Sequence, residues 1–325
     1  MRAVLAEEFA PYEKLVIGEV PPKRARAGEV VIAVKACGVN FLDGLIVQGK
    51  YQTKPPLPFS PGAEVAGLIK EVGADVRALS VGMRVLAFPG YGGYADEVLV
   101  EACKVIPLPD RMDFTSAASF PITYATSHHA LKDRAALKSG ETLLVLGAAG
   151  GVGLTAVEIG KIIGARVIAC ASSEEKLALC KQYGADALIN YATSDLRERI
   201  KELTGGKGVD VVYDPVGGQY AEPVLRSVAY QGRYLVIGFA SGEIPKIPLN
   251  LLLLKVASLV GVFWGAFAKA EPARSAANFS ELLSWYQAGR LRPHVSATYP
   301  IAQFAEALEV VMNRKAMGKV VLLVD

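Results

Sequence analysis

The order of apolar and polar positions changes character along the chain. In the first third, short apolar or alternating runs are separated by turns rich in Gly and Pro, as in PGAEVAG and GYGGYADE. This pattern is typical of β-strands in a compact, sharply bent, barrel-like sheet. The expected strands are Arg2–Leu5, Glu29–Ala36, Glu64–Val72, Arg84–Phe88 and Asp96–Val100.

Helical spacing begins after Asp113, and Thr115 or Ser116 is expected to begin the first helix. From Glu141 onward, strand and helix patterns alternate, which indicates a doubly wound parallel sheet. The expected strands are Thr142–Leu146, Arg166–Ala171, Ala187–Asn190, Val209–Asp214 and Arg233–Gly238. The expected helices are Val152–Ile163, Glu174–Gln182, Asp195–Leu203 and Ala221–Ser227.

The tail after Ala270 returns to the style of the first third. It carries helical stretches at Asn278–Gln287 and Ile301–Asn313, and a closing strand at Lys319–Val324. We therefore expect an α/β protein of two domains. Residues 1–120 and 270–325 form a substrate domain, and residues 121–269 form a nucleotide-binding domain inserted into it.

Composition excludes two classes of partner. The net charge is only +3 over 325 residues and no dense Lys/Arg tract is present, which argues against nucleic acid. The most apolar stretch, Leu249–Ala268, is interrupted by Lys255 and by small residues. Its β-branched and aromatic runs suit buried strands better than a helix that spans a membrane.

The N-terminus and the cysteines indicate a cytoplasmic location. Acidic residues occupy the place where a signal peptide has its apolar core, in MRAVLAEEFAPYEKL. The cysteines are scattered without C-x-x-C spacing, which fits a reducing compartment: Cys37, Cys103, Cys170 and Cys180.

A glycine-rich loop joins the strand at Thr142–Leu146 to the following helix. The loop reads GAAGGVG, with Ala148, Gly150 and Gly153 at the three fingerprint positions of a dinucleotide site. Helix N-termini bind pyrophosphate through free backbone N–H groups and the helix dipole. The loop predicts a cofactor site made by Gly150, Gly151, Val152 and Gly153, with a tight turn that binds no ligand as the alternative.

The end of the second strand of this domain indicates which cofactor is bound. NAD enzymes usually carry Asp or Glu there to hold the ribose hydroxyls. Here the position is occupied by Ser172 and Ser173, and Glu174 and Glu175 lie in the next helical turn. Ser172, Ser173 and Lys176 are candidates to bind a 2′-phosphate, which favours NADPH. The alternative for the serines is a helix N-cap, which does not exclude phosphate binding.

Several separate motifs in the same order resemble one family along essentially the whole chain. They are ACGVNFLDGLIVQGKY, PFSPGAEVAGLIKEVG, VGMRV, GGYADE, AAGGVGLTAVEIGK, GGKGVDVVYDPVGG and MGKVVLLV. They resemble the quinone oxidoreductase branch of the medium-chain dehydrogenases/reductases. The resemblance implies a Rossmann domain inserted into a GroES-like β-barrel domain.

The resemblance also bears on zinc. Where zinc alcohol dehydrogenases carry Cys and His ligands, this chain has Asn40 and Ala63. The later Cys ligand of those enzymes corresponds to a position near Ile122, where this chain has no Cys. Only Glu64 of the ligand set survives, the structural lobe with four cysteines is missing, and zinc needs three or four converging ligands. The histidines lack ligand spacing and are interpreted as ordinary helix or loop residues: His128, His129 and His294. No metal is predicted.

Two residues are implied to act at the acceptor. Asn40 is expected beside the nicotinamide, where its amide can donate to an oxygen on which charge develops, although it can alternatively hold a turn. Tyr51 matches a Tyr that lines the substrate cleft in quinone oxidoreductases and donates a proton in enoyl thioester reductases; simple packing is its alternative. Asp43 is expected to bond the local backbone. A family Tyr after Asp43 has no aromatic counterpart at Gly44 or Leu45, which implies a roomier pocket.

The resemblance adds further residues on the cofactor side. They are Thr126 near the nicotinamide, Tyr191 at the adenine end, Phe239 and Ser241 after the fifth strand, and Phe263 and Trp264 at the border of the cofactor and acceptor pockets. For Phe263 and Trp264, packing in the core or in a dimer interface is the alternative. The apolar strand at Leu259–Phe263 is where this family pairs two subunits edge to edge, which implies a homodimer.

Three functions are compatible with these residues. The first is NADPH-dependent reduction of quinones by metal-free hydride transfer, in which the cofactor carries the chemistry. The second is NADPH-dependent C=C reduction of an enone, enal or enoyl thioester, with a proton from Tyr51 or water. The third is a catalytically silent NADPH-binding protein.

Overall fold

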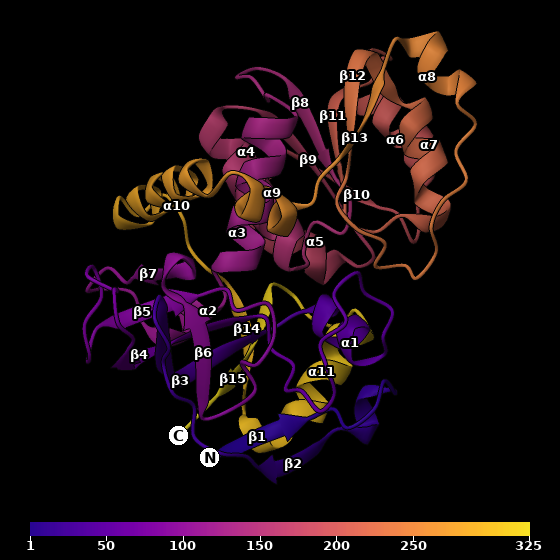
Figure 1. Ribbon diagram of the computed structural model, residues 1–325. Helices are drawn as coiled ribbons and strands as arrows, with labels where there is room; N and C mark the ends of the chain where they lie inside the picture. Colours follow the sequence, from indigo (N-terminus) through magenta and orange to yellow (C-terminus); the bar gives the residue numbers. More distant parts are fainter. The chain divides into compact units, whose positions relative to one another are not determined.

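The computed structural model describes all residues from Met1 to Asp325, which form two compact units (Figure 1). Unit 1 comprises Met1–Ile122 and Pro293–Asp325, and unit 2 comprises Thr123–Arg292. The unit made of two separate segments and the inserted unit correspond to the two domains expected from the sequence. The return to unit 1 comes at Pro293, however, and not at residue 270.

Helix α10 (Pro272–Gln287) explains the later boundary, because it is bonded to unit 2. Its Glu281 accepts hydrogen bonds from Lys132 and lies 2.7 Å from the ring nitrogen of His128. Its Arg274 forms an ion pair with Asp133 at 2.7 Å. The sequence pattern reveals that this segment is helical, but not which surface the helix covers.

Unit 1 is built around a sheet of seven strands in the order β14-β15-β3-β4-β5-β7, with β6 also paired to β3. Its strands are β3 (Glu29–Val39), β4 (Glu64–Val72), β5 (Arg84–Ala87), β6 (Glu97–Glu101), β7 (Val105–Pro107), β14 (Val295–Pro300) and β15 (Lys319–Leu323). Strands β1 (Arg2–Leu5) and β2 (Val16–Glu19) form a separate pair. The tail belongs to unit 1 because β15 pairs antiparallel with β3.

The register of β3 brings distant charged residues together. Gly38 is paired with Glu64 of β4, and the next residue, Val39, is paired with Val320 of β15. The end of β3 therefore lies between the start of β4 and the start of β15, where Lys319 is the first residue.

The helices of unit 1 are short. They are α1 (Phe41–Val47), α2 (Phe114–Ala118) and α11 (Phe304–Met312), and α3 (Pro121–His128) begins at the boundary with unit 2. The expectation that Thr115 or Ser116 begins the first helix of this region was wrong. Asp113 is the N-cap of α2, because its carboxylate accepts a hydrogen bond from Ser116 N at 2.8 Å.

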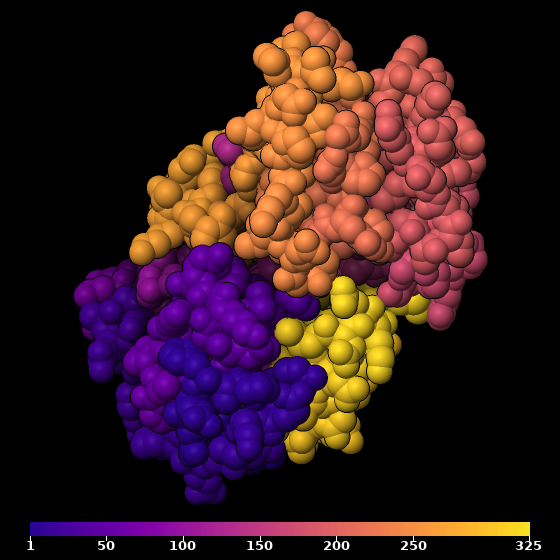
Figure 2. Space-filling view, turned by 90° about the vertical axis from the view of Figure 1, so that its right-hand side faces the viewer, coloured from indigo at the N-terminus to yellow at the C-terminus, as the bar shows by residue number.

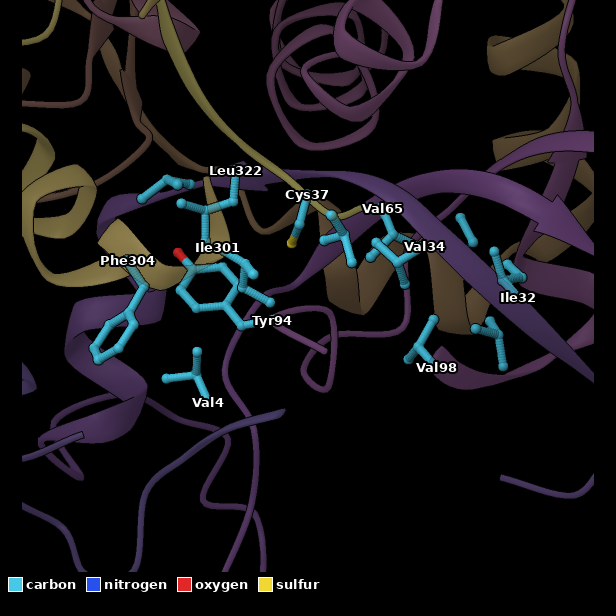
Figure 3. Packing of buried hydrophobic residues seen from close by; sticks show 14 of the residues in the cluster. Val4, Ile32, Val34, Cys37, Val65, Tyr94, Val98, Ile301, Phe304 and Leu322 are labelled. Atoms are coloured by element: carbon cyan, nitrogen blue, oxygen red, sulfur yellow. The ribbon is translucent and has the colours of Figure 1, made fainter. Parts of the chain in front are cut away.

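The core of unit 1 joins the early strands to the C-terminal segment. Figure 3 shows apolar side chains of β3, β4 and β6 packed with those of the tail, and the ring of Tyr94 among them. Tyr94 is fully buried, as is Cys37 on β3. The same core therefore fixes the end of β3, from which α1 begins.

Unit 2 contains a parallel six-stranded sheet in the order β10-β9-β8-β11-β12-β13. Its strands are β8 (Thr142–Val145), β9 (Arg166–Ala171), β10 (Ala187–Asn190), β11 (Val209–Asp214), β12 (Val228–Val236) and β13 (Ser258–Gly261). Its helices after α3 are α4 (Gly151–Ile163), α5 (Glu174–Gln182), α6 (Leu196–Leu203), α7 (Ala221–Arg226), α8 (Asn250–Lys255), α9 (Trp264–Ala270) and α10. Counted from β8, the strand order is 3-2-1-4-5-6, the order of doubly wound dinucleotide-binding folds.

The apolar stretch Leu249–Ala268 does not form buried strands as expected. It forms the short helices α8 and α9 and the edge strand β13, which pairs only with β12. Leu253 and Leu254 of α8 are 78% and 73% exposed. Figure 2 shows the chain around residues 240–260, in orange, on the surface of unit 2. No helix of the protein is both long enough and apolar enough to cross a bilayer.

Candidate functional site

The glycine-rich loop of unit 2 follows β8 and leads into α4, a helix of 13 residues. Gly150 is the N-cap of α4, and its N–H donates to Gly147 O at 3.0 Å. A Cβ on Gly153 would lie 2.2 Å from Gly147 O, so the helix packs on the loop only with glycine there. The first-turn N–H groups of a helix have no partners within the helix and are suited to bind an anion.

The turn after β11 completes this part of the sheet edge. Asp214 is 3% exposed and accepts hydrogen bonds from the N–H groups of Val216 (2.7 Å) and Gly217 (2.9 Å) and from the hydroxyl of Tyr234. Burial raises the pKa of Asp214. Strands β8 and β11 are neighbours from which the sheet grows in opposite directions, and the carboxyl ends of such strands form ligand-binding crevices. Asp214 was not predicted as a functional residue, although it lies within the motif GGKGVDVVYDPVGG.

The residues predicted to bind a 2′-phosphate lie together where β9 ends. Ser173 is the N-cap of α5 and accepts a hydrogen bond from Lys176 N at 3.3 Å. The Lys176 ammonium is 3.4 Å from Ser172 Oγ. Glu174, the first acid after the strand, accepts a hydrogen bond from Asn190 Nδ2 at 2.7 Å. Two hydroxyls and one ammonium are therefore presented at this strand end, and the nearest carboxylate is bonded to Asn190.

The loop after β12 brings two more predicted residues to the same edge, beside the turn after β11. Ser241 N donates to Val216 O at 2.9 Å, and Ser241 Oγ donates to Glu243 O at 3.3 Å. Phe239 is 37% exposed and lies close to Gly217, where an added Cβ would meet its ring at 2.9 Å. Phe239 and Ser241 thus border the turn that Asp214 shapes.

The remaining residues predicted on the cofactor side differ in how far they are exposed. Tyr191 follows β10, and its ring centroid is 4.6 Å from that of Tyr220. Thr126 is partly exposed on α3, and Phe263 is 50% exposed beyond β13. Trp264 is only 6% exposed and packs edge-on against Phe279, so its ring belongs to the interior of unit 2.

In unit 1, Asn40 lies in a buried polar cluster at the end of β3. Its Nδ2 donates to Glu64 Oε1 at 2.8 Å and to Gly38 O at 3.2 Å, and its Oδ1 accepts from Lys319 Nζ at 2.7 Å. Lys319 Nζ also donates to Glu64 Oε1 at 2.7 Å, and the other oxygen of Glu64 accepts from Ile122 N. Sequence reasoning did not identify Lys319, which is the residue after the glycine in MGKVVLLV.

Asp43 stabilises the start of α1, as expected for a residue that bonds the local backbone. Its Oδ2 accepts from Asn40 N at 2.8 Å and from the Tyr94 hydroxyl at 3.3 Å, whereas its buried Oδ1 has no hydrogen-bond partner. Burial raises the pKa of Asp43 to about 7. Tyr51, after α1, is partly buried beside the apolar core of unit 1, and its pKa is raised by burial and by the charge of Asp43.

No three His, Cys, Asp or Glu side chains are grouped so that they can hold a metal ion. In unit 1, the Cys37 thiol donates to the backbone oxygen of Glu64 at 3.1 Å, and Ala63 is fully buried. In unit 2, His128 pairs with Glu281, and His129 pairs with Asp133. The side chains of Cys37, His128 and His129 are thus each bonded to another group of the protein.

Two family models match separate parts of the chain. A family model described as an alcohol dehydrogenase GroES-like domain matches residues 26–110, and one described as a zinc-binding dehydrogenase matches residues 151–285. Quinone oxidoreductase-like protein 2 of Bos taurus is 40% identical over 322 residues, which are 99% of this chain and 92% of that protein. The chain belongs to the quinone oxidoreductase family of medium-chain dehydrogenases/reductases.

Other members of the family are similarly related. The quinone oxidoreductase of Homo sapiens is 34% identical over 326 residues, covering 99% of this chain and 98% of that protein. The crystal structure of Escherichia coli quinone oxidoreductase complexed with NADPH is 30% identical, covers the whole of both chains and superposes with a TM-score of 0.94. The fold expected from the sequence, a Rossmann domain inserted into a GroES-like domain, is thereby confirmed.

Proposed function

We propose that this protein is an NADPH-dependent oxidoreductase that reduces quinones by hydride transfer without a metal ion. The observation that carries the proposal is the arrangement at the carboxyl edge of the unit 2 sheet. There the loop of Gly150–Gly153 begins α4, and Ser172, Ser173 and Lys176 stand at the next strand end, where Glu174 is bonded to Asn190. The NADPH complex of the Escherichia coli relative supports the choice of cofactor.

The chain's own groups fit this cofactor. The backbone N–H groups of Gly151, Val152 and Gly153, which follow the N-cap Gly150, are suited to bind the pyrophosphate, and Ser172, Ser173 and Lys176 to bind the 2′-phosphate. Tyr191 would lie against the adenine, and Phe239 and Ser241 beside the turn that Asp214 shapes. Thr126 and Phe263 would border the nicotinamide, with Trp264 supporting them from the interior. When bound, NADPH supplies the hydride.

The residues of unit 1 support a reaction without a Lewis acid. Ala63 carries no ligand atom, and the amide of Asn40 is bonded to Glu64 and Lys319. Quinones are readily reduced and need little polarisation of their carbonyl groups, so positioning and hydrogen bonding suffice. In this proposal the N–H edge of Asn40 faces the acceptor oxygen and gives up its 3.2 Å bond to Gly38 O. Tyr51 lines the acceptor pocket.

Two further properties belong to the proposal. The unpaired edge of β13 and the exposed side chains of Leu259 and Phe263 support a homodimer joined through this strand, as expected from the family. All four cysteines are free thiols, which supports a reducing, cytoplasmic location. Nucleic acid and membrane are not among the proposed partners.

Initial rates with a panel of acceptors test the function. With NADPH, we expect 1,4-benzoquinone and 9,10-phenanthrenequinone to be reduced faster than an enone or a crotonyl thioester. Faster reduction of the enone or the thioester would instead assign C=C reduction. Tyr51→Phe separates the two reactions, because loss of a proton donor should abolish C=C reduction and leave quinone reduction largely intact. NADPH binding without turnover of any acceptor would assign a catalytically silent protein.

A further inference from the structure

Lys319 is a buried lysine whose three hydrogen-bond donors are all used. The residue is 5% exposed, and its ammonium donates to Val39 O at 3.1 Å as well as to Asn40 Oδ1 and Glu64 Oε1. Glu64, its ionic partner, is 0% exposed. The strand register creates this contact, because the start of β15 and the start of β4 lie on opposite sides of the end of β3.

Stability alone does not account for such a pair. The free energy needed to remove two charges from water offsets much of the free energy gained by their attraction. Proteins in which well-packed apolar residues replace a buried ion pair are often as stable or more stable. A buried ion pair fixes geometry, because its donors and acceptors tolerate only one arrangement. We therefore expect Lys319 and Glu64 to hold a third group in place.

The group that they hold is the side-chain amide of Asn40. An ammonium only donates hydrogen bonds, so the atom of Asn40 that faces Lys319 must be the amide oxygen. The amide nitrogen then faces Glu64, which accepts its hydrogen bond at 2.8 Å. The reverse orientation would place an NH₂ group against the ammonium and leave a carbonyl oxygen against the carboxylate. The ion pair thus selects one of the two orientations of the amide.

The same contacts reach α1 and the connection to unit 2. Asn40 is the N-cap of α1, and its N–H donates to Asp43 Oδ2. Helix α1 leads directly to the segment that carries Tyr51. The second oxygen of Glu64 accepts from Ile122 N at 2.8 Å, and Ile122 is the last residue of the first segment of unit 1. A change in the ion pair would therefore alter the hydrogen bonds of the Asn40 amide, of the start of α1 and of Ile122 N, where the chain leaves unit 1.

We propose that Lys319 is a positioning residue for the reduction: paired with Glu64, it sets the orientation of the Asn40 amide toward the acceptor. This inference rests on the proposed function. Lys319 touches neither cofactor nor acceptor in this account and acts through Asn40. Its charge also draws electron density toward the amide oxygen and makes the amide N–H a stronger donor.

Three variants test the proposal kinetically. Lys319→Met removes the charge at similar length, Lys319→Arg keeps a charge, and Glu64→Gln/Lys319→Met leaves no unpaired charge and protects the test against misfolding. We expect both Met variants to lower kcat/KM for the acceptor about 10- to 100-fold while the Kd of NADPH stays within about twofold. Lys319→Arg should recover part of the loss. Lys104→Met is the matched control, because Lys104 forms an exposed ion pair with Glu101 in the same unit, and it should change nothing.

A spectroscopic measurement distinguishes failure of this inference from failure of the proposed function. The chain has five asparagines, so labelling asparagine with ¹⁵N gives five side-chain NH₂ signals, of which Asn40→Ala identifies one. The chemical shift of that signal should change in both Met variants and stay the same in Lys104→Met, whether or not the wild type reduces quinones. An unmoved signal would overturn the inference. So would a folded double variant with wild-type kcat/KM on any acceptor that the wild type reduces.

Discussion

At the scale of single residues, two charged side chains have effects that can be measured separately from the rest of the protein. Lys176 lies at the end of β9 and is partly exposed, whereas Asp43 is fully buried at the start of α1. The first concerns only which dinucleotide is bound. The second concerns how stability depends on pH.

Lys176→Ala should weaken NADPH binding more than NADH binding. The ammonium is 3.4 Å from Ser172 Oγ, so it can reach a phosphate held by that hydroxyl. A hydrogen bond to a charged group contributes about 1.5–3 kcal/mol, so the Kd of NADPH should rise about tenfold or more while that of NADH is nearly unchanged. Fluorescence titration measures both constants, with Lys181→Ala on the same helix as the control. Equal losses for the two cofactors would refute the phosphate assignment.

Asp43 should make the protein less stable as the pH rises. Its pKa is about 7 in the folded state, against about 3.9 for an exposed Asp. Between these two values the folded state binds more protons than the unfolded state, so the free energy of unfolding falls with increasing pH, by at most about 1.4 kcal/mol per pH unit from this group. Above the folded pKa this contribution becomes constant.

Asp43→Asn tests this linkage. The amide oxygen can still accept the hydrogen bond from Asn40 N, and the side chain of the variant does not titrate. Urea unfolding between pH 5 and pH 8 should therefore show a smaller fall in stability for the variant than for the wild type. Identical pH profiles for the two proteins would show that Asp43 does not titrate in this range.

At the scale of secondary-structure elements, the nucleotide-binding unit was the part most directly predictable from the sequence. Strands β9, β10 and β11 and helix α5 have the predicted bounds, because apolar runs for buried parallel strands alternate with helical spacing and turn residues there. Asp113 was missed as a helix N-cap, since three residues with capping side chains follow one another closely and local sequence does not rank them. Leu249–Ala268 was misjudged because an apolar strand at a sheet edge and a buried one have similar composition.

The candidate site was predictable only where its residues are consecutive. The Gly150–Gly153 loop and the Ser172, Ser173 and Lys176 group each lie within one strand–helix junction, so spacing alone locates them. The contact of Lys319 with Asn40 and Glu64 depends on the pairing of β15, β3 and β4, which are far apart in the sequence. No local pattern encodes that register.

Gly153→Val tests the junction of loop and helix as an element. A Cβ at this position would approach Gly147 O at 2.2 Å and Ala148 Cα at 2.8 Å, so the start of α4 must move away from β8. We expect the Kd values of NADPH and NADH to rise together, at least about tenfold, because the pyrophosphate common to both loses its N–H donors. Gly265→Ala in α9 is the control, since its Cβ would meet nothing closer than 3.6 Å. A loss confined to NADPH would show that the loop does not hold the pyrophosphate.

At the scale of the whole molecule, the surface of unit 2 near β13 predicts association of two chains. Strand β13 has a free edge, Leu259 on it is 38% exposed, and Leu254 on the nearby α8 is 73% exposed. Free strand edges and exposed apolar side chains favour pairing with another chain. Light scattering should therefore give twice the chain mass of 34.5 kDa. Leu254→Glu/Leu259→Lys should shift the protein toward the monomer at micromolar concentration, because each charge would have to be buried at the interface. Val81→Lys, which alters an exposed apolar residue of unit 1, should leave the mass unchanged. A double variant that stays dimeric would place the interface elsewhere on the molecule, and a wild-type protein with the mass of one chain would contradict the prediction.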